Sequence, residues 1–439
     1  MAKQDTGRAR IPTVSRLLAD GKRIELTYSS EEKCTRLAIF ENGETSLVEE
    51  LELDNGDTLV PIKASNNLIK HGAVLLAEMP EPYGSVAELI EAIQEYMHRY
   101  VDLSERFQRI ASYYILLTWV YDAFNEVPYL RLRGDFGSGK TRALIVIGSL
   151  CYKAFFASGA STVSPIFHTL DTFRGTLIFD EADFRFSDEK SELVKIFNNG
   201  NAKGFPVLRT AMTVKNEFDP RAFNVFGPKI VAMRRSFEDQ ALESRFLTEE
   251  MGQRSLRDDI PINLPDAQKE EARSLRNRLL MYRFQSLERI KIDESLVDPS
   301  LSPRLNQILV PLLSIIDDKQ LQEEVRDSVK SFDQDLYAER SASAEAGILE
   351  ILAEMISEPS RASIPVAEVT TAFVGRFGQE YDRPITNRFI GGILRKRLRL
   401  STYKSHGVYV VPATEKQKVD QLCIRYGVIE HSTDTAKAP

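Results

Sequence analysis

A glycine-rich octapeptide, Gly134–Thr141 (GDFGSGKT), carries the clearest chemistry in the chain. Its spacing, G-x-x-x-x-G-K-[ST], is one in which backbone N–H groups cradle phosphates, a lysine reaches the β- and γ-phosphates, and a hydroxyl binds Mg²⁺. Residues 127–133 alternate like a strand, and residues 141–151 are apolar like a buried helix. This flanking pattern favours a phosphate loop over an ordinary glycine-rich turn. The predicted nucleotide-binding residues are Gly134, Asp135, Phe136, Gly137, Ser138, Gly139, Lys140 and Thr141.

Two adjacent carboxylates at the end of a second strand extend this chemistry toward hydrolysis. Residues 175–183 (GTLIFDEAD) have the pattern of a buried strand that ends in Asp180 and Glu181. The carboxyl ends of parallel strands meet at one edge of a sheet, so this pair should lie beside the phosphate loop. We predict that Asp180 binds Mg²⁺ through its water shell, together with Thr141, and that Glu181 polarises the attacking water. A polar strand end that merely faces solvent is the alternative. The predicted cofactors are ATP and Mg²⁺.

Composition limits the classes of protein to consider. The chain has 439 residues and a net charge of −7, from 57 basic and 64 acidic side chains, so nucleic-acid contact would require a local basic patch. The three cysteines are scattered and the five histidines do not cluster, which argues against zinc sites and disulfides. Residues 1–10 lack an apolar signal core, and the most apolar helix candidate, residues 110–120, is too short to span a bilayer. We therefore expect a cytoplasmic protein with no membrane partner.

The region before the phosphate loop divides into two parts. Residues 1–84 are predicted to form a small β-rich domain, because short alternating runs are separated by turn signals such as Asn42-Gly43. No catalytic constellation is found there, and its partner is unknown; a docking, collar or specificity module is our interpretation. Residues 85–126 are predicted to form a helical lead-in, beginning with the capping-box residues Ser85 and Glu88. The predicted N-terminal strands are residues 22–28, 36–40, 58–62 and 73–78.

Residues 127–250 alternate strand and helix patterns, which predicts an α/β core with a parallel sheet. Residues 203–226 differ, because short strand-like runs surround a polar turn, and they predict a β-hairpin inserted before the next core strand at 228–233. The basic side chains Arg209 and Lys215 in this hairpin suit contact with a polyanion. A solvated surface hairpin is an equal alternative.

Arg245 follows the last core strand pattern and lies between small and apolar residues, in the run ALESRF. An arginine in such a position is a candidate for insertion into the site of another subunit, where it would stabilise charge on the γ-phosphate. Pairing with a surface carboxylate is the alternative. We predict a catalytic role for Arg245 beside Lys140, Asp180 and Glu181.

The remainder of the chain is predicted to contain a helical lid, a linker, a compact C-terminal domain and a disordered tail. These are residues 251–340, 341–345, 346–430 and 431–439. Three helices followed by a β-hairpin in the C-terminal domain are the arrangement of a winged helix. From Arg383 to Thr414 there are seven basic residues and no Asp or Glu, which indicates a nucleic-acid-binding face; a basic protein-interaction wing is the alternative. The candidate DNA-contacting residues there are Arg388, Arg395, Lys396, Arg397 and Lys404.

Taken in this order, these features resemble the AAA+ ATPases, and within them the minichromosome-maintenance-like and phage or mobile-element replicative helicases. The resemblance covers roughly residues 85–412 and includes the triplet Ser244-Arg245-Phe246, which is similar to the family's arginine finger. It implies a homo-oligomeric ring, in most cases a hexamer, with ATP between subunits and single-stranded or duplex DNA as partner. One departure concerns the sensor asparagine expected after strand 228–233, because Arg234-Arg235-Ser236 stands there.

The expected architecture is therefore an α/β P-loop AAA+ core with an inserted β-hairpin and helical lid, preceded by a small β-rich domain and followed by a winged helix. The expected function is that of an ATP-dependent, ring-forming DNA helicase or translocase in phage or mobile-element replication. The alternative is a regulatory or defence ATPase whose nucleotide state switches oligomerisation, with the winged helix docking proteins. A small-molecule kinase is disfavoured, because Asp180-Glu181 is a pair typical of hydrolysis.

Overall fold

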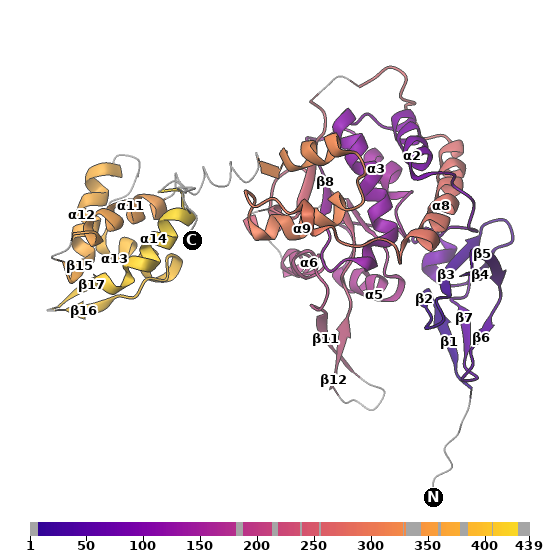
Figure 1. The fold of residues 1–439 in the computed structure, drawn as a ribbon, viewed down its shortest axis with the longest axis horizontal. Coiled ribbons are helices and arrows are strands. Elements are labelled where there is room, and N and C mark those ends of the chain that lie inside the picture. The colour runs from indigo at the N-terminus through magenta and orange to yellow at the C-terminus, as the bar shows by residue number, and fades with distance from the viewer. Residues whose placement is uncertain are drawn as a thin grey trace, which may run out of the picture. The chain divides into compact units, whose positions relative to one another are not determined.

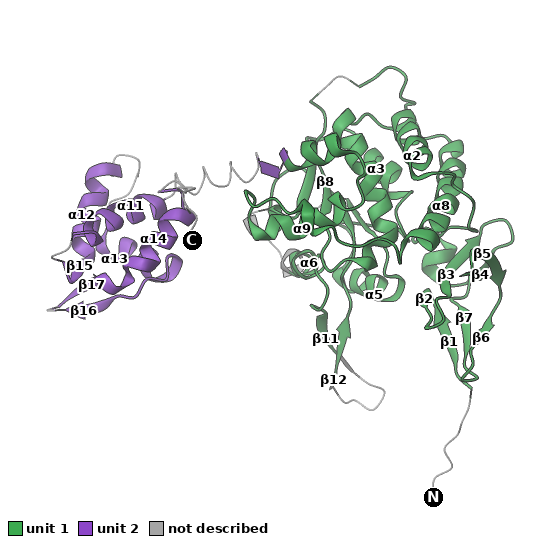
Figure 2. Cartoon of the chain, in the orientation of Figure 1, with its two compact units in different colours: residues 1–326 green, residues 327–439 purple. Residues whose placement is uncertain are grey.

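The chain forms two compact units, residues 1–326 and 327–439 (Figure 2). The computed structural model describes residues 8–180, 188–212, 218–237, 239–253, 256–327, 329–330, 344–358, 361–377, 385–405 and 407–428.

The first unit begins with two small sheets, of strand order β2-β3-β4-β5 and β1-β7-β6 (Figure 1). Alternating side chains such as Ile24, Leu37 and Leu59 point into a shared core, as the period-2 pattern predicted. Asn42 and Gly43 have positive φ angles of 52° and 87°, which a type I′ hairpin turn requires, so the predicted turn is confirmed. The strands are β1 (Arg10–Thr13), β2 (Ser15–Leu17), β3 (Arg23–Ser29), β4 (Cys34–Glu41), β5 (Glu44–Val48), β6 (Leu51–Glu52) and β7 (Thr58–Pro61).

The predicted strand at residues 73–78 is wrong. After the short helix α1 (Asn67–Lys70), this segment makes a single antiparallel bridge, between Val74 and Phe155. Its apolar side chains are buried because the segment runs along the edge of the core sheet, with the Leu75 N–H donating to the Ala154 carbonyl at 2.8 Å. The alternating apolar pattern of residues 73–78 therefore arises because one side of an irregular segment is buried, and not because the segment is a strand.

Two helices lead from these sheets into the core. α2 (Val86–Tyr100) starts at the predicted capping box, in which Ser85 and Glu88 bond reciprocally. α3 (Glu105–Val120) is followed by the 3₁₀ turn η1 (Tyr121–Ala123), and every residue of α3 from Ile110 onward is buried. An apolar helix of this kind is covered on all sides by protein. Within the described part of the chain, no helix is long and apolar enough to cross a membrane.

Five parallel strands form the centre of the first unit, in the order β14-β8-β13-β10-β9. This confirms the predicted α/β parallel core. The strand before the phosphate loop, β8, and the strand that ends in Asp180, β10, are separated by β13, so the end of β13 lies between the two motifs. The strands are β8 (Tyr129–Arg133), β9 (Phe155–Ser158), β10 (Leu177–Asp180), β13 (Lys229–Met233) and β14 (Phe246–Glu250), and the helices among them are α4 (Lys140–Gly148), α5 (Val163–Phe173), α6 (Asp188–Asn199) and α7 (Gln240–Glu243).

An antiparallel pair, β11 (Val207–Met212) and β12 (Phe218–Phe223), projects from the core between β10 and β13 in the chain (Figure 1). At its base the fully buried side chain of Lys229 donates from Nζ to the carbonyls of Gly200, Val225 and Gly227, at 3.1, 2.9 and 2.9 Å. Burial lowers the pKa of this ammonium, and the nearby Arg245 lowers it further. One side chain thus ties the end of α6 and the exit of β12 to the central strand β13.

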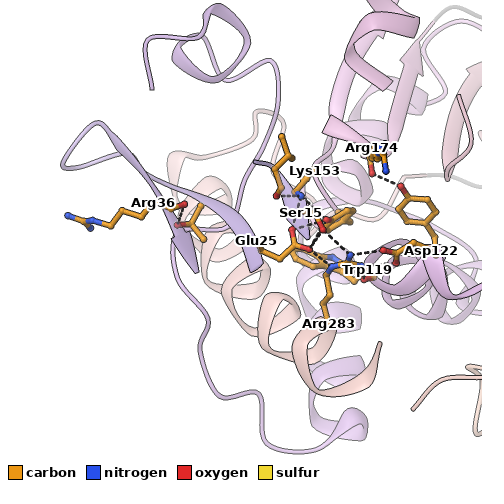
Figure 3. Close-up of polar contacts among 12 residues, drawn as sticks. Ser15, Glu25, Arg36, Trp119, Asp122, Lys153, Arg174 and Arg283 are labelled. Carbon is orange, nitrogen blue, oxygen red and sulfur yellow. Dashed lines mark hydrogen bonds and ion pairs between the residues drawn. The ribbon is translucent and has the colours of Figure 1, made fainter. Parts of the chain in front are cut away.

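A buried ion cluster joins the N-terminal sheets to the core (Figure 3). Glu25 on β3 accepts from Arg283 Nε at 2.6 Å and lies 2.7 Å from Lys153 Nζ. Arg283 also donates to both carboxylate oxygens of Asp122, at 2.9 and 2.7 Å, and to the Trp119 carbonyl at 2.6 Å. Arg283 belongs to α8 (Asp266–Ser286), which is followed by η2 (Glu294–Leu296), α9 (Pro303–Leu313) and helical residues 319–327.

The second unit packs helices around a three-stranded antiparallel sheet of order β15-β17-β16. One helix of this unit is α-helical from Asn387 to Gly392 and continues as a π-helical turn, Ile393–Arg397, directly after Gly391-Gly392. The C-terminal helix α14 was not predicted; it buries Val419 and Cys423 in the core of this unit. Its elements are α11 (Ala344–Ile356), β15 (Ser363–Pro365), α12 (Val366–Phe377), α13 (Asn387–Gly392), β16 (Tyr403–Ser405), β17 (Val408–Pro412), η5 (Ala413–Glu415) and α14 (Lys416–Arg425).

Candidate nucleotide-binding site

The octapeptide forms the turn between β8 and α4. Gly137 and Gly139 have φ angles of 79° and 87°, a left-handed conformation that glycine adopts without steric cost, and Gly139 is the N-cap of α4. The first N–H groups of a helix have no acceptor within it, and they carry the positive end of the helix dipole. The loop therefore presents backbone donors to an anion at the start of α4.

Lys140 lies folded over this loop. Its Nζ donates to the carbonyl oxygens of Gly134 and Asp135, both at 2.6 Å, and lies 3.3 Å from Ser138 Oγ. An anionic phosphate oxygen is a stronger acceptor for an ammonium than a neutral carbonyl oxygen. The loop thus holds the cation where a bound phosphate chain can take over its hydrogen bonds.

Thr141 and Asp180 meet across the end of β13. Thr141 Oγ1 donates to Asp180 Oδ2 at 2.7 Å. Hydroxyl and carboxylate oxygens suit Mg²⁺, which binds through one or two protein groups while waters and phosphates fill its other positions. The pair therefore fits this ion. Elsewhere among the residues with described positions, no group of three or more His, Cys, Asp or Glu side chains could hold a metal. Glu181 lies outside the described residues.

A cavity of about 550 Å³ lies beside the loop, a size within the range of small-molecule sites. Its walls include Phe136, whose side chain is 90% exposed, and the chain segment that follows β14. That segment packs closely, since a Cβ on Gly134 would lie 2.5 Å from the Met251 carbonyl oxygen. Arg142 on α4 donates to the carbonyls of Pro261 and Ile262. The sequence pattern did not identify this wall, because most of these contacts are made by backbone atoms.

Arg245 lies at the amino ends of the core strands, whereas the phosphate loop lies at their carboxyl ends. It directly precedes β14, and its carbonyl accepts from the Tyr129 N–H at the start of β8, whereas the loop follows the end of β8. The residue is 8% exposed, and its guanidinium donates from Nη1 to Asn198 Oδ1 at the end of α6. Burial and the nearby Arg304 lower its pKa. Within one chain, Arg245 is thus separated from the phosphate loop by the length of a strand.

A buried ion pair supports both regions. Arg131 on β8 and Glu243 on α7 are paired at 2.5 Å, with side chains 3% and 7% exposed. Arg131 Nε also donates to Thr248 Oγ1 on β14 at 3.0 Å, and its guanidinium lies 5.2 Å from the Phe246 ring centroid. The strand that leads into the phosphate loop is therefore tied to the segment that carries Arg245.

The hairpin and the C-terminal unit hold the other predicted basic residues. Arg209 pairs with Glu192 at 2.8 Å, and Lys215 lies outside the described residues, as does Arg383. In the second unit Arg397 pairs with Glu345 at 2.5 Å, so part of its charge is neutralised within the unit. The other candidates there, Arg388, Arg395, Lys396 and Lys404, are exposed.

No protein-family model matches the sequence, and no curated protein sequence matches it. Similar solved structures include the apo NrS-1 C-terminal region, at 12% identity and a TM-score of 0.36 over 89% of this chain and 96% of that one. JCV helicase matches at 17% identity and 0.23, over 57% and 61%. The Aeropyrum pernix ORC1 protein in complex with DNA matches at 12% and 0.20, over 76% and 96%. At TM-scores this low, the assignment of the site rests on the residues and contacts described above.

Proposed function

We propose that this protein is an ATP-dependent, ring-forming DNA helicase or translocase of the AAA+ type, acting in phage or mobile-element replication. The observation that carries the proposal is the contact between Thr141 Oγ1 and Asp180 Oδ2 at 2.7 Å, beside a phosphate loop of the predicted form. It brings together the hydroxyl and the carboxylate that a hydrolase of nucleoside triphosphates needs.

In this proposal the loop amides and Lys140 hold the triphosphate, and Thr141 and Asp180 hold Mg²⁺ between them. The ion would neutralise charge on the β- and γ-phosphate oxygens. Glu181, the residue after Asp180, is proposed to orient the attacking water. Each of the four side chains, Lys140, Thr141, Asp180 and Glu181, has a role that one substitution can remove.

Ring formation is supported by the place of Arg245. A guanidinium at the opposite edge of the sheet from its own phosphate loop can act on ATP only in another copy of the chain. A second copy whose Arg245 faced the first copy's loop would complete the site and couple hydrolysis to the subunit interface. DNA contact is assigned to the hairpin β11–β12 and to the basic face of the second unit, which we propose to be a winged helix.

The contact between Arg245 and Asn198 also favours a second candidate. In this contact the guanidinium of Arg245 is bound within its own chain. Such an arrangement suits a regulatory or defence ATPase that oligomerises only in one nucleotide state. The two functions differ in their response to DNA, because only a translocase spends ATP on moving along a strand.

The test is ATP turnover of the full chain with and without single-stranded DNA. We expect turnover that DNA stimulates severalfold, loss of turnover in Lys140→Ala, and ATP binding without turnover in Glu181→Gln. Full turnover in Lys140→Ala would refute the assignment of the phosphate loop. Slow ATP turnover of the wild type, at a rate that single-stranded DNA does not change, would support the regulatory ATPase instead.

A further inference from the structure

A second cavity of about 550 Å³ lies at the amino ends of the core strands. Its wall combines β2, η1, the end of α5 and residues 202–206, which lead into the hairpin strand β11. We call it the hairpin-root groove and define it by Arg16, Tyr121, Arg174, Lys203 and Phe205.

The hairpin-root groove carries an excess of positive charge. Arg16, Arg174 and Lys203 are all exposed, and no carboxylate in the described part of the chain pairs with Arg16 or Arg174. The one acidic side chain in the wall, Asp122, has both oxygens bonded to Arg283. Lys203 donates to the backbone carbonyl of Asp122 at 2.8 Å, which fixes its ammonium at the rim. The groove thus offers three cations to an anionic ligand.

An exposed aromatic ring accompanies these cations. Phe205 is 66% exposed between Gly204, with φ 91°, and Pro206, so its ring is presented to solvent by a turn. Leu208, in the strand β11 that follows, is 67% exposed. Grooves that bind single strands combine cations along the sugar–phosphate backbone with aromatic faces on which bases stack.

The groove is separate from the candidate ATP site. Tyr152, Arg174 and Phe226 in its wall precede β9, β10 and β13, whereas the phosphate loop and Asp180 lie at the carboxyl ends of β8 and β10. A strand of five residues spans about 15 Å, so a phosphate in the groove could not reach the loop. The two sites can therefore be tested independently.

We propose that the hairpin-root groove binds single-stranded DNA. Phosphates lie against Arg16, Arg174 and Lys203, and a base stacks on Phe205 before the strand continues along the hairpin. This inference deepens the proposed function and rests on it, since it places the strand on a surface beside the hairpin β11–β12. A run of Asp or Glu in a peptide would use the cations but has no aromatic ring to stack on Phe205, which is why we choose a nucleic acid.

The experiment measures fluorescence anisotropy of labelled dT20 with the full-length protein over a range of salt concentrations. In Arg16→Glu/Arg174→Glu we expect at least a tenfold loss of affinity. The slope of log K against log salt should become shallower by about 1.4, since each phosphate contact on a single strand contributes about 0.7. Phe205→Ala should weaken binding by roughly 5- to 150-fold, while Phe205→Trp should restore it. Lys63→Glu/Lys70→Glu, which changes the charge equally outside the groove, is the matched control.

ATP turnover without DNA separates the two proposals. We expect it to stay at the wild-type level in the groove variants, with its stimulation by dT20 lost. If the groove variants bind dT20 as the wild type does, with the same salt slope, the groove assignment is wrong and the ATPase assignment stands. If they lose binding of a labelled poly-glutamate but keep dT20, the groove takes an acidic protein and our proposal is again wrong. Absence of turnover in the wild type would instead count against the proposed function.

Discussion

Replacing Glu25 by glutamine should destabilise the first unit by several kcal/mol. Glu25 and its partners Lys153 and Arg283 are each 3–4% exposed, so solvent does not screen their charges. Removing one member of a buried ion pair costs about 3–5 kcal/mol, because the opposite charge is left buried without compensation. Asp122 still faces Arg283 in the variant, but Lys153 loses the carboxylate of its ion pair. We therefore expect a loss of about 3 kcal/mol or more at pH 7.

The difference in stability between the wild type and Glu25→Gln should become smaller both at acid and at alkaline pH. Burial alone would raise the pKa of Glu25, but Lys153 and Arg283 outweigh it and hold the pKa below the ordinary value of 4.5. The carboxylate's contribution is therefore present above pH 4.5 and is lost as the pH falls, so the wild type approaches the variant in acid.

On the alkaline side the difference comes from Lys153. Burial lowers its pKa to about 8, although Glu25 acts to raise it. Without Glu25 this pKa falls further. Between that lower value and pH 8 the folded variant binds fewer protons than its unfolded chain, so the variant gains stability as the pH rises. The deficit should thus be largest between pH 4.5 and the lowered pKa of Lys153, and should narrow from that pKa to pH 8.

Tryptophan fluorescence during urea unfolding measures this directly. The chain has one tryptophan, Trp119, which is 2% exposed and whose carbonyl accepts from Arg283, so its signal reports on the first unit alone. The matched control is Glu32→Gln, which removes an exposed carboxylate in the turn between β3 and β4. Glu32 pairs there with Arg36 on β4. That variant should unfold like the wild type. Equal midpoints for Glu25→Gln and Glu32→Gln at pH 7 would refute the reasoning.

Three further changes test the candidate site. Gly134→Ala should abolish ATP binding in an equilibrium titration, because its Cβ would lie 2.5 Å from the Met251 carbonyl oxygen; unchanged affinity would contradict that packing. Arg131→Met should lower the free energy of unfolding by about 3–5 kcal/mol, since Glu243 would stay buried without its cation, and Trp119 fluorescence would report a smaller loss if the pair were dispensable. Arg245→Ala should be inactive in ATP turnover alone but partly active when mixed with Lys140→Ala, because mixed interfaces pair an intact loop with an intact arginine. No recovery at any mixing ratio would argue against action between subunits.

Local sequence patterns were sufficient where a short stretch determines its own geometry. The phosphate loop needs glycines at positions such as 137 and 139, whose φ angles are positive, and the capping box at Ser85 and Glu88 closes on itself. Features that depend on distant segments were missed. Glu25, Lys153 and Arg283 come from three separate regions, and nothing near any one of them indicates the other two.

Dependence on distant segments also explains why the strand predicted at residues 73–78 was wrong. Residues 73–78 alternate like a strand, but they lie along the edge of β9, where neither the N-terminal sheets nor the core sheet extends over them. The spatial order of the core strands could not be predicted from the amino-acid sequence, because the strands of a parallel sheet can lie side by side in several different orders. That order is what brings Thr141 and Asp180 together across the end of β13.

The contact between Lys229 and Gly200 implies a constraint on how this chain can change over time. A Cβ on Gly200 would lie 2.3 Å from Lys229 Nζ and 2.5 and 2.6 Å from the backbone carbonyl oxygens of Val225 and Ile196, so no larger residue fits at position 200 with or without the lysine. Losing the lysine would leave three buried carbonyls short of a donor. Divergent descendants of this chain should therefore keep glycine at position 200 whatever stands at position 229, and should replace Lys229 only where another donor reaches those carbonyls.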